Sequence, residues 1–317
     1  MDAPPTAAAA SAVPVRSATW RPGRPVPLST ILGTVRRGAG DPTCAVRDGM
    51  LWRGQQTPEG PATVALESVP AQGEVRAHAW GSGADWALTW LPASLGAADH
   101  PDGFRVPGPL AQVQRVHPHW RVPRTGLVYE ALVAAGLEQR VTGREAWTGW
   151  RRLLHRYGQV APGPAGTWGL RVLPAPSVLR GVPSWEWLRM HVDGSRSRVV
   201  LRAAIHHDAL QRTLDMAPED ADRALRSLPG VGVWTSAEVR QRAHGHSDAV
   251  SFGDYHVAAS VGVALTGEPV DDDGMARLIE EHRPHRYRIQ RLVELAGIRK
   301  ERHGPRMAPR RHLPGSA

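Results

Sequence analysis

The feature that most constrains this chain is a short turn between two helical patterns. One apolar helix period ends at Leu228, and a second begins at Val233 and runs to Ala243, with Gly245 as its stop signal. Between them stands Pro229-Gly230-Val231-Gly232, a turn of small and conformationally permissive residues. The two glycines allow backbone amides at a helix start to approach an anion with no side chain in between. The sequence therefore predicts two helices joined by a hairpin turn that can bind phosphate.

A lone carboxylate, Asp254, follows this unit directly before another apolar helical run. An aspartate at a helix start is most often a capping residue when it is considered alone. A Pro-Gly turn considered alone is likewise often only a turn. The order and spacing of the two features together favour chemistry on DNA.

The charge of the chain favours a polyanionic partner. Its 317 residues carry a formal net charge of +9 and an isoelectric point near 10.9, and nucleic acid is the leading candidate for such a partner. Lys300 is the only lysine, so the positive charge is almost entirely arginine. Arginine suits two-point contacts with phosphate, although a bias toward GC-rich codons would enrich it equally.

Few residues of this chain suit a metal ion. The single cysteine, Cys44, excludes an internal disulfide and any all-cysteine zinc or iron–sulfur site. The histidines at 206–207 and at 244 and 246 have no cysteine or spaced carboxylate to complete a ligand set. We expect these histidines to be solvated or to cap helix ends.

No run reaches the roughly 20 apolar residues that a membrane helix needs. The Ala/Pro-rich stretch 4–14 lacks the basic start and leucine-rich centre of a signal peptide. We therefore expect a disordered leader over residues 1–27 and a cytoplasmic protein, associated with the nucleoid when it is bound to DNA.

The hydrophobic patterning divides the rest of the chain and indicates an α+β fold. Residues 28–110 carry short alternating apolar runs between Gly/Pro turns, which predicts a small antiparallel sheet domain. We expect residues 111–298 to form a mainly helical unit, and residues 299–317 to be a basic, disordered tail. The helical periods cover residues 126–136, 144–157, 176–181, 184–191, 195–214, 255–265, 272–282 and 285–295.

These motifs resemble those of the helix-hairpin-helix base-excision DNA glycosylases, and among them the bacterial type II 3-methyladenine DNA glycosylases. The hairpin signature is Leu228-Pro229-Gly230-Val231-Gly232-Val233-Trp234-Thr235. Asp254-Tyr255 stands where the family carries its catalytic aspartate, followed in the alkylation-repair branch by tyrosine. Residues 133–142 are similar to the helix and loop that insert into DNA. The resemblance covers residues 124–298, and 28–110 more weakly; it implies an all-helical core of two lobes with the active site in the cleft between them.

The resemblance implies a role for each matched residue. Asp254 would be catalytic, and the base pocket would be formed by Trp234, Glu238 and Tyr255. The DNA-binding residues would be Gly230, Val231, Gly232, Thr235, Gln139 and Arg140. Arg140 would fill the gap left by a flipped base; without the resemblance it is equally consistent with a surface arginine. The carbonyl oxygens of Arg226, Leu228 and Val231 would bind a monovalent cation, Na⁺ or K⁺, and no other cofactor is expected.

The implied chemistry is hydrolysis of a base from DNA. A damaged base inside a duplex is unreachable, so the enzyme flips the nucleotide into a pocket. Asp254 would stabilise the positive charge on the sugar as the glycosidic bond breaks, activate water, or do both. Bifunctional members carry a lysine at the position of Trp234, which attacks the sugar and goes on to cut the strand. Trp234 therefore predicts a monofunctional enzyme, and the missing cysteine loop argues against the iron–sulfur branches of the family.

The expected pocket differs from that of the alkylation-repair branch, which is aromatic where this chain has Glu238, Glu294 and Leu295. Glu238 lies four residues after Trp234 on the same helix face, so both can face one space. It can hydrogen-bond a base edge or a cation there, or lie on a solvated helix face. The identity of the damaged base therefore stays open.

The sequence as a whole favours a monofunctional DNA glycosylase that removes a damaged, alkylated base from double-stranded DNA and acts as a monomer. One alternative is a non-catalytic helix-hairpin-helix protein that binds damaged or distorted DNA. The pairing of Asp254 with Tyr255 disfavours this alternative, because binding alone does not require a carboxylate facing DNA. A strand-cutting lyase is disfavoured by Trp234.

Overall fold

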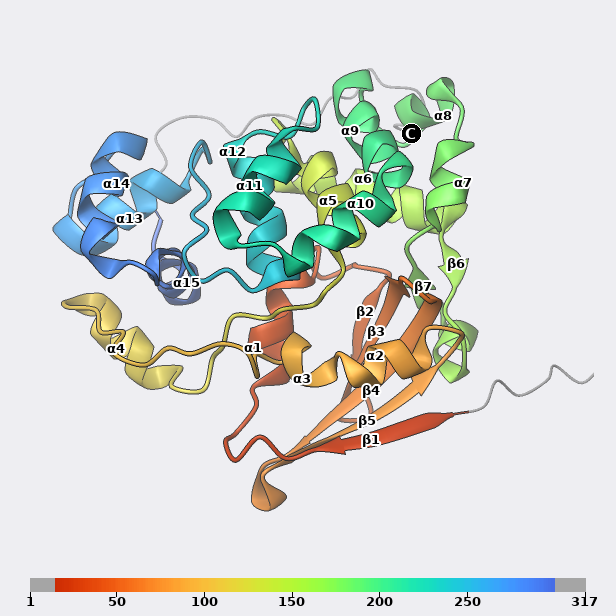
Figure 1. Cartoon of the computed structure of the whole chain (residues 1–317), viewed down its shortest axis with the longest axis horizontal. Coiled ribbons are helices and arrows are strands. Elements are labelled where there is room, and N and C mark those ends of the chain that lie inside the picture. Colours follow the sequence, from red (N-terminus) through yellow and green to blue (C-terminus); the bar gives the residue numbers. More distant parts are fainter. Residues whose placement is uncertain (1–14, 300–317) are drawn as a thin grey trace, which may run out of the picture.

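The computed structural model describes residues 15–299 and confirms the α+β fold (Figure 1). An antiparallel sheet lies on one side of the molecule, and most helices of the remaining chain lie on the other. None of the helices within the described residues is long and apolar enough to cross a membrane. Residues 1–14 of the expected leader and, apart from Arg299, the expected basic tail lie outside the described residues.

The sheet has the strand order β1-β5-β4-β3-β2, with every neighbouring pair antiparallel. The strands are β1 (Arg16–Trp20), β2 (Cys44–Arg47), β3 (Met50–Thr57), β4 (Gly60–Val69) and β5 (Glu74–Trp80). Asp48-Gly49 joins β2 to β3 with positive φ at both residues, 52° and 75°. This is the backbone conformation that a two-residue hairpin turn of the Asp-Gly type requires.

The first strand, β1, lies inside the segment expected to be a disordered leader, and that expectation is wrong for residues 16–20. Its side chains are mostly exposed, so the strand has no apolar alternation that a sequence pattern could detect. It forms because its backbone pairs with β5, from Arg16 opposite Ala79 to Trp20 opposite Val75. The partner strand is far along the chain and leaves no local signal.

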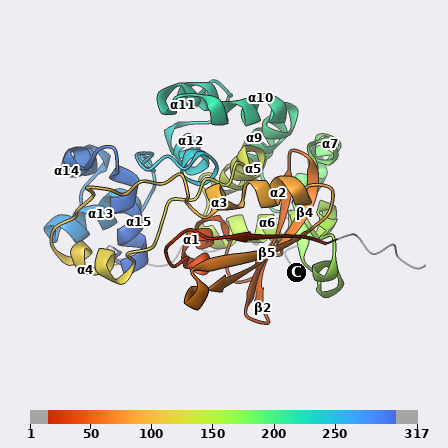
Figure 2. The ribbon, with the colours of Figure 1, turned by 60° about the horizontal axis from the view of Figure 1, so that its bottom comes forward.

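One face of the sheet is covered by three short helices and by the helical unit itself. The helices are α1 (Leu28–Leu32), α2 (Ala84–Thr89) and α3 (Leu91–Ser94), and their apolar side chains share a buried cluster with β3, β4 and β5. Trp120, Val122 and Tyr287 from later segments belong to the same cluster. The sheet therefore packs against α15 (Arg286–Ala296) through Tyr287 as well as against the three short helices, and α10, α11 and α12 lie beyond them (Figure 2).

The remaining helices form two groups, each around its own buried cluster. The first group comprises α5 (Val128–Glu138), α6 (Gly143–Tyr157), α7 (Pro176–Arg180), α8 (Ser184–Arg189), α9 (Gly194–Ile205), α10 (His207–Gln211), α11 (Pro218–Arg226) and α12 (Val233–Val239). The second comprises α4 (Pro109–Val116), α13 (Val257–Thr266), α14 (Asp272–Ile279) and α15 (Arg286–Ala296). The helical periods predicted from the sequence coincide with most of these helices, with small differences at the ends.

Two segments depart from the expected domain limits. Phe104, Val106 and Leu110 pack with α13, α14 and α15 rather than with the sheet, so the boundary expected at residue 110 lies several residues too late. The hairpin of β6 (Gln159–Val160) and β7 (Arg171–Val172) interrupts the helical unit and packs against β3 and β4. A side chain at Gly54 of β3 would lie 2.2 Å from the Arg171 carbonyl oxygen, so this close approach requires glycine.

Helix α12 continues into a wider, π-helical turn. This turn spans Arg240–His244 and stops at Gly245, which has φ of 74° as a left-handed helix stop. The carbonyl oxygens of Arg242 and Ala243 accept the N–H groups of Thr125 and Gly126, each at 3.0 Å. The end of α12 thereby fixes the chain segment that leads into α5.

Of the histidines expected to be solvated or to cap helix ends, His244 is buried and His246 is half-buried at this turn. His244 is 5% exposed, and its Nε2 lies 2.9 Å from the Thr213 hydroxyl. Its ring centroid lies 5.1 Å from that of His246. Burial, followed by neighbouring positive groups, lowers the pKa of His244 to about 3 and that of His246 to about 4. Both rings are therefore neutral in the folded protein at physiological pH.

We expect the free energy of unfolding to fall as the pH drops from about 6.5 toward 4. The unfolded chain binds protons on both histidines in this range, whereas the folded chain does not, so stability is full above pH 6.5 and decreases below it. Each histidine contributes a slope of about 1.4 kcal/mol per pH unit. Urea unfolding at several pH values checks this, with His246→Gln as the comparison. Equal slopes for the variant and the wild type would contradict it.

Candidate active site

The predicted hairpin is present between α11 and α12. The chain turns after Ser227, and the Val231 N–H donates to the Leu228 carbonyl at 3.0 Å. Gly230 has φ of 88°, a left-handed conformation that favours glycine, whereas Gly232 is extended and caps α12. Both glycines are exposed, so the backbone at the start of α12 is open to an anion.

Asp222 of α11 ties the two helices of the unit together. Its carboxylate accepts the Ser236 hydroxyl at 2.6 Å and lies 3.0 Å from Arg240, both from the α12 side, and 3.1 Å from Arg226. Partial burial opposes ionisation, but the Ser236 hydrogen bond and the two guanidinium groups outweigh it and lower the pKa of Asp222. At neutral pH, an ionised carboxylate on α11 thus links this helix to α12 and to the turn that follows it.

The loop after α5 contacts the hairpin from the other side. The Gln139 side-chain amide donates to the Gly230 carbonyl at 2.8 Å and to the Thr235 hydroxyl at 2.9 Å. Arg140, the next residue, is exposed and has φ of 55°, in the left-handed region. Arg202 of α9 adds a hydrogen bond to the Pro229 carbonyl at 2.8 Å. The structure therefore places Gln139, Arg140 and the hairpin next to one another on one surface.

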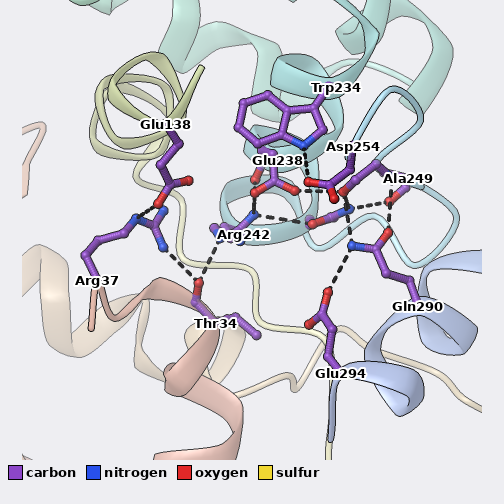
Figure 3. A network of polar contacts seen from close by, with 12 residues as sticks. Thr34, Arg37, Glu138, Trp234, Glu238, Arg242, Ala249, Asp254, Gln290 and Glu294 are labelled. Carbon is purple, nitrogen blue, oxygen red and sulfur yellow. Dashed lines mark hydrogen bonds and ion pairs between the residues drawn. The ribbon is translucent and has the colours of Figure 1, made fainter. Parts of the chain in front are cut away.

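Asp254 faces Trp234 and also caps a helix (Figure 3). Its Oδ2 accepts the indole N–H of Trp234 at 3.2 Å. Its Oδ1 accepts the backbone N–H groups of His256 and Val257, at 2.7 and 3.1 Å, where α13 begins. The capping interpretation and the site interpretation are therefore compatible, because each uses a different carboxylate oxygen.

Glu238 is buried rather than solvated, being 7% exposed one helical turn below Trp234 (Figure 3). Its carboxylate accepts the Ser251 hydroxyl at 2.7 Å and forms an ion pair with Arg242 at 2.8 Å. Burial raises the pKa of Glu238, with Arg242 acting in the opposite direction. Glu238, Arg242 and Ser251 form a layer of polar side chains beneath Trp234 and Asp254, which we call the polar layer.

The polar layer continues into α15. The Gln290 side chain accepts the Ser251 backbone N–H at 3.0 Å and donates to Glu294 at 3.0 Å. Glu294 is exposed and also pairs with Arg291 at 2.8 Å. Gln290 and Ser251 were missed by the sequence analysis, since uncharged polar residues separated by many positions carry no local signal.

Tyr255 is the predicted pocket residue that the structure does not bring to the site. It is 90% exposed, and its ring lies edge-on to that of His256, at 4.8 Å between centroids. Asp254 turns inward to cap α13, and the next residue then points to solvent. Trp234 and Glu238, in contrast, lie together as their spacing predicted.

No group of three or more histidine, cysteine, aspartate or glutamate side chains that could hold a metal ion occurs within residues 15–299. The expected cation site instead consists of the backbone carbonyls of Arg226, Leu228 and Val231, at the C-terminal end of α11 and in the turn. The Leu228 carbonyl accepts one N–H and retains a second lone pair for such an ion. A monovalent cation on these three carbonyls remains a prediction.

No family model matches this chain, and no curated protein matches it by sequence. Among solved structures, the 3-methyladenine DNA glycosylase from Archaeoglobus fulgidus superposes with a TM-score of 0.71 at 15% identity, covering 87% of this chain and 97% of that one. MBOgg1 in complex with a low-affinity DNA ligand gives 0.66 at 13% identity, covering 90% and 98%. The Clostridium acetobutylicum 8-oxoguanine glycosylase/lyase in complex with double-stranded DNA gives 0.61 at 10% identity, covering 86% and 91%. The chain therefore has the fold of the helix-hairpin-helix DNA glycosylases, as its motifs predicted.

We expect Gly230→Ala to lower the free energy of unfolding by about 1–3 kcal/mol, because alanine is strained at this positive φ. Its Cβ would also lie 2.8 Å from a Val199 methyl group. Gly232→Ala is the matched control, since nothing lies within 4 Å of its Cβ position and its φ is negative. Thermal unfolding of both variants provides the measurement. Similar losses in the two variants would show that the strain is not local to Gly230.

Proposed function

We propose that this protein is a monofunctional DNA glycosylase, which hydrolyses the N-glycosidic bond of a damaged, alkylated base in double-stranded DNA during base excision repair. The observation that carries the proposal is the position of Asp254. Its carboxylate lies beside Trp234 of α12, directly behind a hairpin whose backbone is open to phosphate. The shared fold supports this proposal, because the three superposed structures are described as glycosylases or as bound to DNA.

In this mechanism the hairpin holds the strand and Arg140 supports the flipped state. The exposed amides at Gly230 and Gly232 bind a phosphate without reading sequence. Arg140, exposed on the adjacent loop, occupies the space that the flipped nucleotide leaves in the stack. A Na⁺ or K⁺ ion on the carbonyls of Arg226, Leu228 and Val231 would supply positive charge near the same phosphate.

Asp254 acts on the sugar of the flipped nucleotide. As the bond from C1′ to the base nitrogen breaks, the electron pair leaves with the base and positive charge develops on the sugar. The ionised carboxylate stabilises that charge and orients a water molecule, whose oxygen bonds to C1′ and whose proton is released. The Trp234 indole and the start of α13 hold the carboxylate in place through three hydrogen bonds.

The proposal of hydrolysis without strand cleavage rests on Trp234. A lyase of this fold needs an amine nucleophile beside the catalytic aspartate, and this chain has an indole there, hydrogen-bonded to Asp254 at 3.2 Å. Lys300, the only lysine of the chain, lies outside the described residues and far along the sequence. An alkylated purine suits the site, because a cationic base is attracted by the Trp234 ring and by the carboxylate of Asp254.

We expect Asp254→Asn to lower the rate of base release at least a hundredfold, since removing one preorganised electrostatic group typically costs that much. Asparagine caps helices about as well as aspartate, so folding and DNA affinity should be preserved. The assay incubates duplexes carrying 3-methyladenine, 7-methylguanine, hypoxanthine or uracil and counts abasic sites. No release of any base by the wild type, with unchanged DNA binding by the variant, would instead support a non-catalytic DNA-binding protein.

We expect Trp234→Phe to reduce kcat by about three- to tenfold, because it removes one hydrogen bond to the catalytic carboxylate while it keeps an aromatic surface. The affinity for an abasic-site duplex should change little. Single-turnover kinetics separate the two effects. A large loss of affinity with unchanged kcat would show that the indole contacts DNA rather than positioning Asp254.

We expect no covalent adduct when the protein, an abasic-site duplex and borohydride are combined, because no lysine lies at the position of Trp234. A known glycosylase/lyase serves as the positive control for trapping. Efficient trapping of this chain would overturn the monofunctional assignment without affecting the proposal that it releases a base.

A further inference from the structure

Helix α9 lies between the two elements that the proposed mechanism brings to DNA, the loop after α5 and the hairpin. At its start, Arg196 donates to the Leu137 carbonyl, shortly before that loop, at 3.1 Å. Farther along, Arg202 donates to the Pro229 carbonyl of the hairpin at 2.8 Å, and a Cβ on Gly230 would lie 3.7 Å from the same guanidinium. α9 and the helices of the hairpin lie together on the side of the molecule away from the sheet (Figure 1). The α9 side chains that share a face with Arg202 therefore border the hairpin.

Arg198 shares this face with Arg202, since residues four apart lie on the same side of a helix. The two side chains leave the helix about 6 Å apart along its axis. The guanidinium of Arg198 lies over the first turn of α9, because a Cβ on Gly194 would be 3.3 Å from its Nη1. We refer to Gly194, Arg198 and Arg202 as the α9 face. It extends from the start of α9 to the hairpin.

The α9 face carries two positive charges that are not paired with a carboxylate. Arg198 is exposed, and its side chain forms no hydrogen bond or ion pair within residues 15–299; that of Arg202 forms only its bond to the hairpin carbonyl. The acids near the start of α9 are engaged instead by Arg196, which is 1% exposed and pairs with Asp193 at 2.9 Å and Glu145 at 3.4 Å. A guanidinium over the first turn of a helix also faces the positive end of the helix dipole, which is unfavourable. The position of Arg198 therefore does not serve the stability of α9.

We propose that the α9 face binds the DNA backbone beside the phosphate that the hairpin holds. Arginine binds a phosphate through two parallel hydrogen bonds, and the single bond of Arg202 to the hairpin leaves its other N–H donors available. Two side chains about 6 Å apart on α9 can reach neighbouring phosphates, because the charges of one strand repeat about every 3.4 Å along the duplex axis. This inference rests on the proposed function, and it adds backbone contacts that the hairpin does not supply.

The experiment measures the binding of R198Q to a duplex that contains an abasic-site analogue, by fluorescence anisotropy over a range of salt concentrations. Since the Arg198 side chain forms no hydrogen bond or ion pair within residues 15–299, R198Q should fold as the wild type does, which thermal unfolding checks. R198K keeps the charge and is the conservative variant. R47Q removes an equal charge from an exposed arginine on the sheet and is the matched control.

We expect R198Q to weaken binding about tenfold, which is the typical effect of losing one hydrogen bond to a charged group. The magnitude of its salt slope should fall by roughly 0.9, the value for one phosphate contact. R198K should retain the salt slope of the wild type, and R47Q should bind as the wild type does. Unchanged binding by R198Q, or an equal loss in R47Q, would overturn the proposal.

A second measurement locates the contact on the DNA. The phosphates around the analogue are replaced one at a time by uncharged methylphosphonates. A replacement that weakens binding by the wild type but not by R198Q marks the phosphate that Arg198 contacts, and R202Q marks that of Arg202 in the same way. We expect the two marked phosphates to be neighbours on one strand. Marked phosphates on different strands, or none for R198Q, would contradict a backbone that lies along the α9 face.

Base release by the wild type separates this inference from the proposed function. Release of a base together with weakened binding by R198Q supports both. Weakened binding by R198Q, in a protein whose wild type releases no base, would retain the α9 face as a DNA contact and reject the glycosylase. Release of a base with unchanged binding by R198Q would retain the glycosylase and reject the α9 face.

Discussion

The geometry of the site depends on one buried ion pair, that of Arg242 with Glu238. Arg242 also donates to the Thr34 carbonyl of the sheet side at 2.8 Å, and Glu238 accepts the Ser251 hydroxyl, which is bonded in turn to Gln290 of α15. Loss of either partner would leave a buried charge without compensation, which typically costs about 3–5 kcal/mol. This ion pair and its hydrogen bonds, together with apolar packing, therefore fix the relative positions of the sheet side, α12 and the second helical group.

The sequence predicted the hairpin, its following helix and the position of Asp254 because all three depend on local chemistry. Glycines at a turn, an apolar helical period and a capping aspartate each leave a signal within a few residues. Trp234 and Glu238 were also placed together correctly, since residues four apart share a helix face. The fold follows from these elements, and the superposed glycosylase structures agree with it at identities of 10–15%.

The rest depends on contacts between distant segments, which leave no local pattern. The sequence left open whether Glu238 lies on a solvated helix face, because its burial requires Arg242, Ser251 and the sheet side to converge on it. β1 exists only through its ladder with β5, and the segment around Phe104 belongs to the second helical group only through packing. Tyr255 was expected in the pocket from the family resemblance, yet adjacent residues at a helix start need not face the same way.

The backbone at Arg140 has a consequence for the free protein. A non-glycine residue with φ of 55° is held in a conformation that costs on the order of 1 kcal/mol, and here it is an exposed arginine with a long side chain. Glycine at this position would relax the backbone and make the DNA-free protein more stable, while it would remove the guanidinium from the loop beside the hairpin. If Arg140 contacts an opened duplex as proposed, optimising this loop for thermostability and optimising it for that contact are opposing objectives at a single residue.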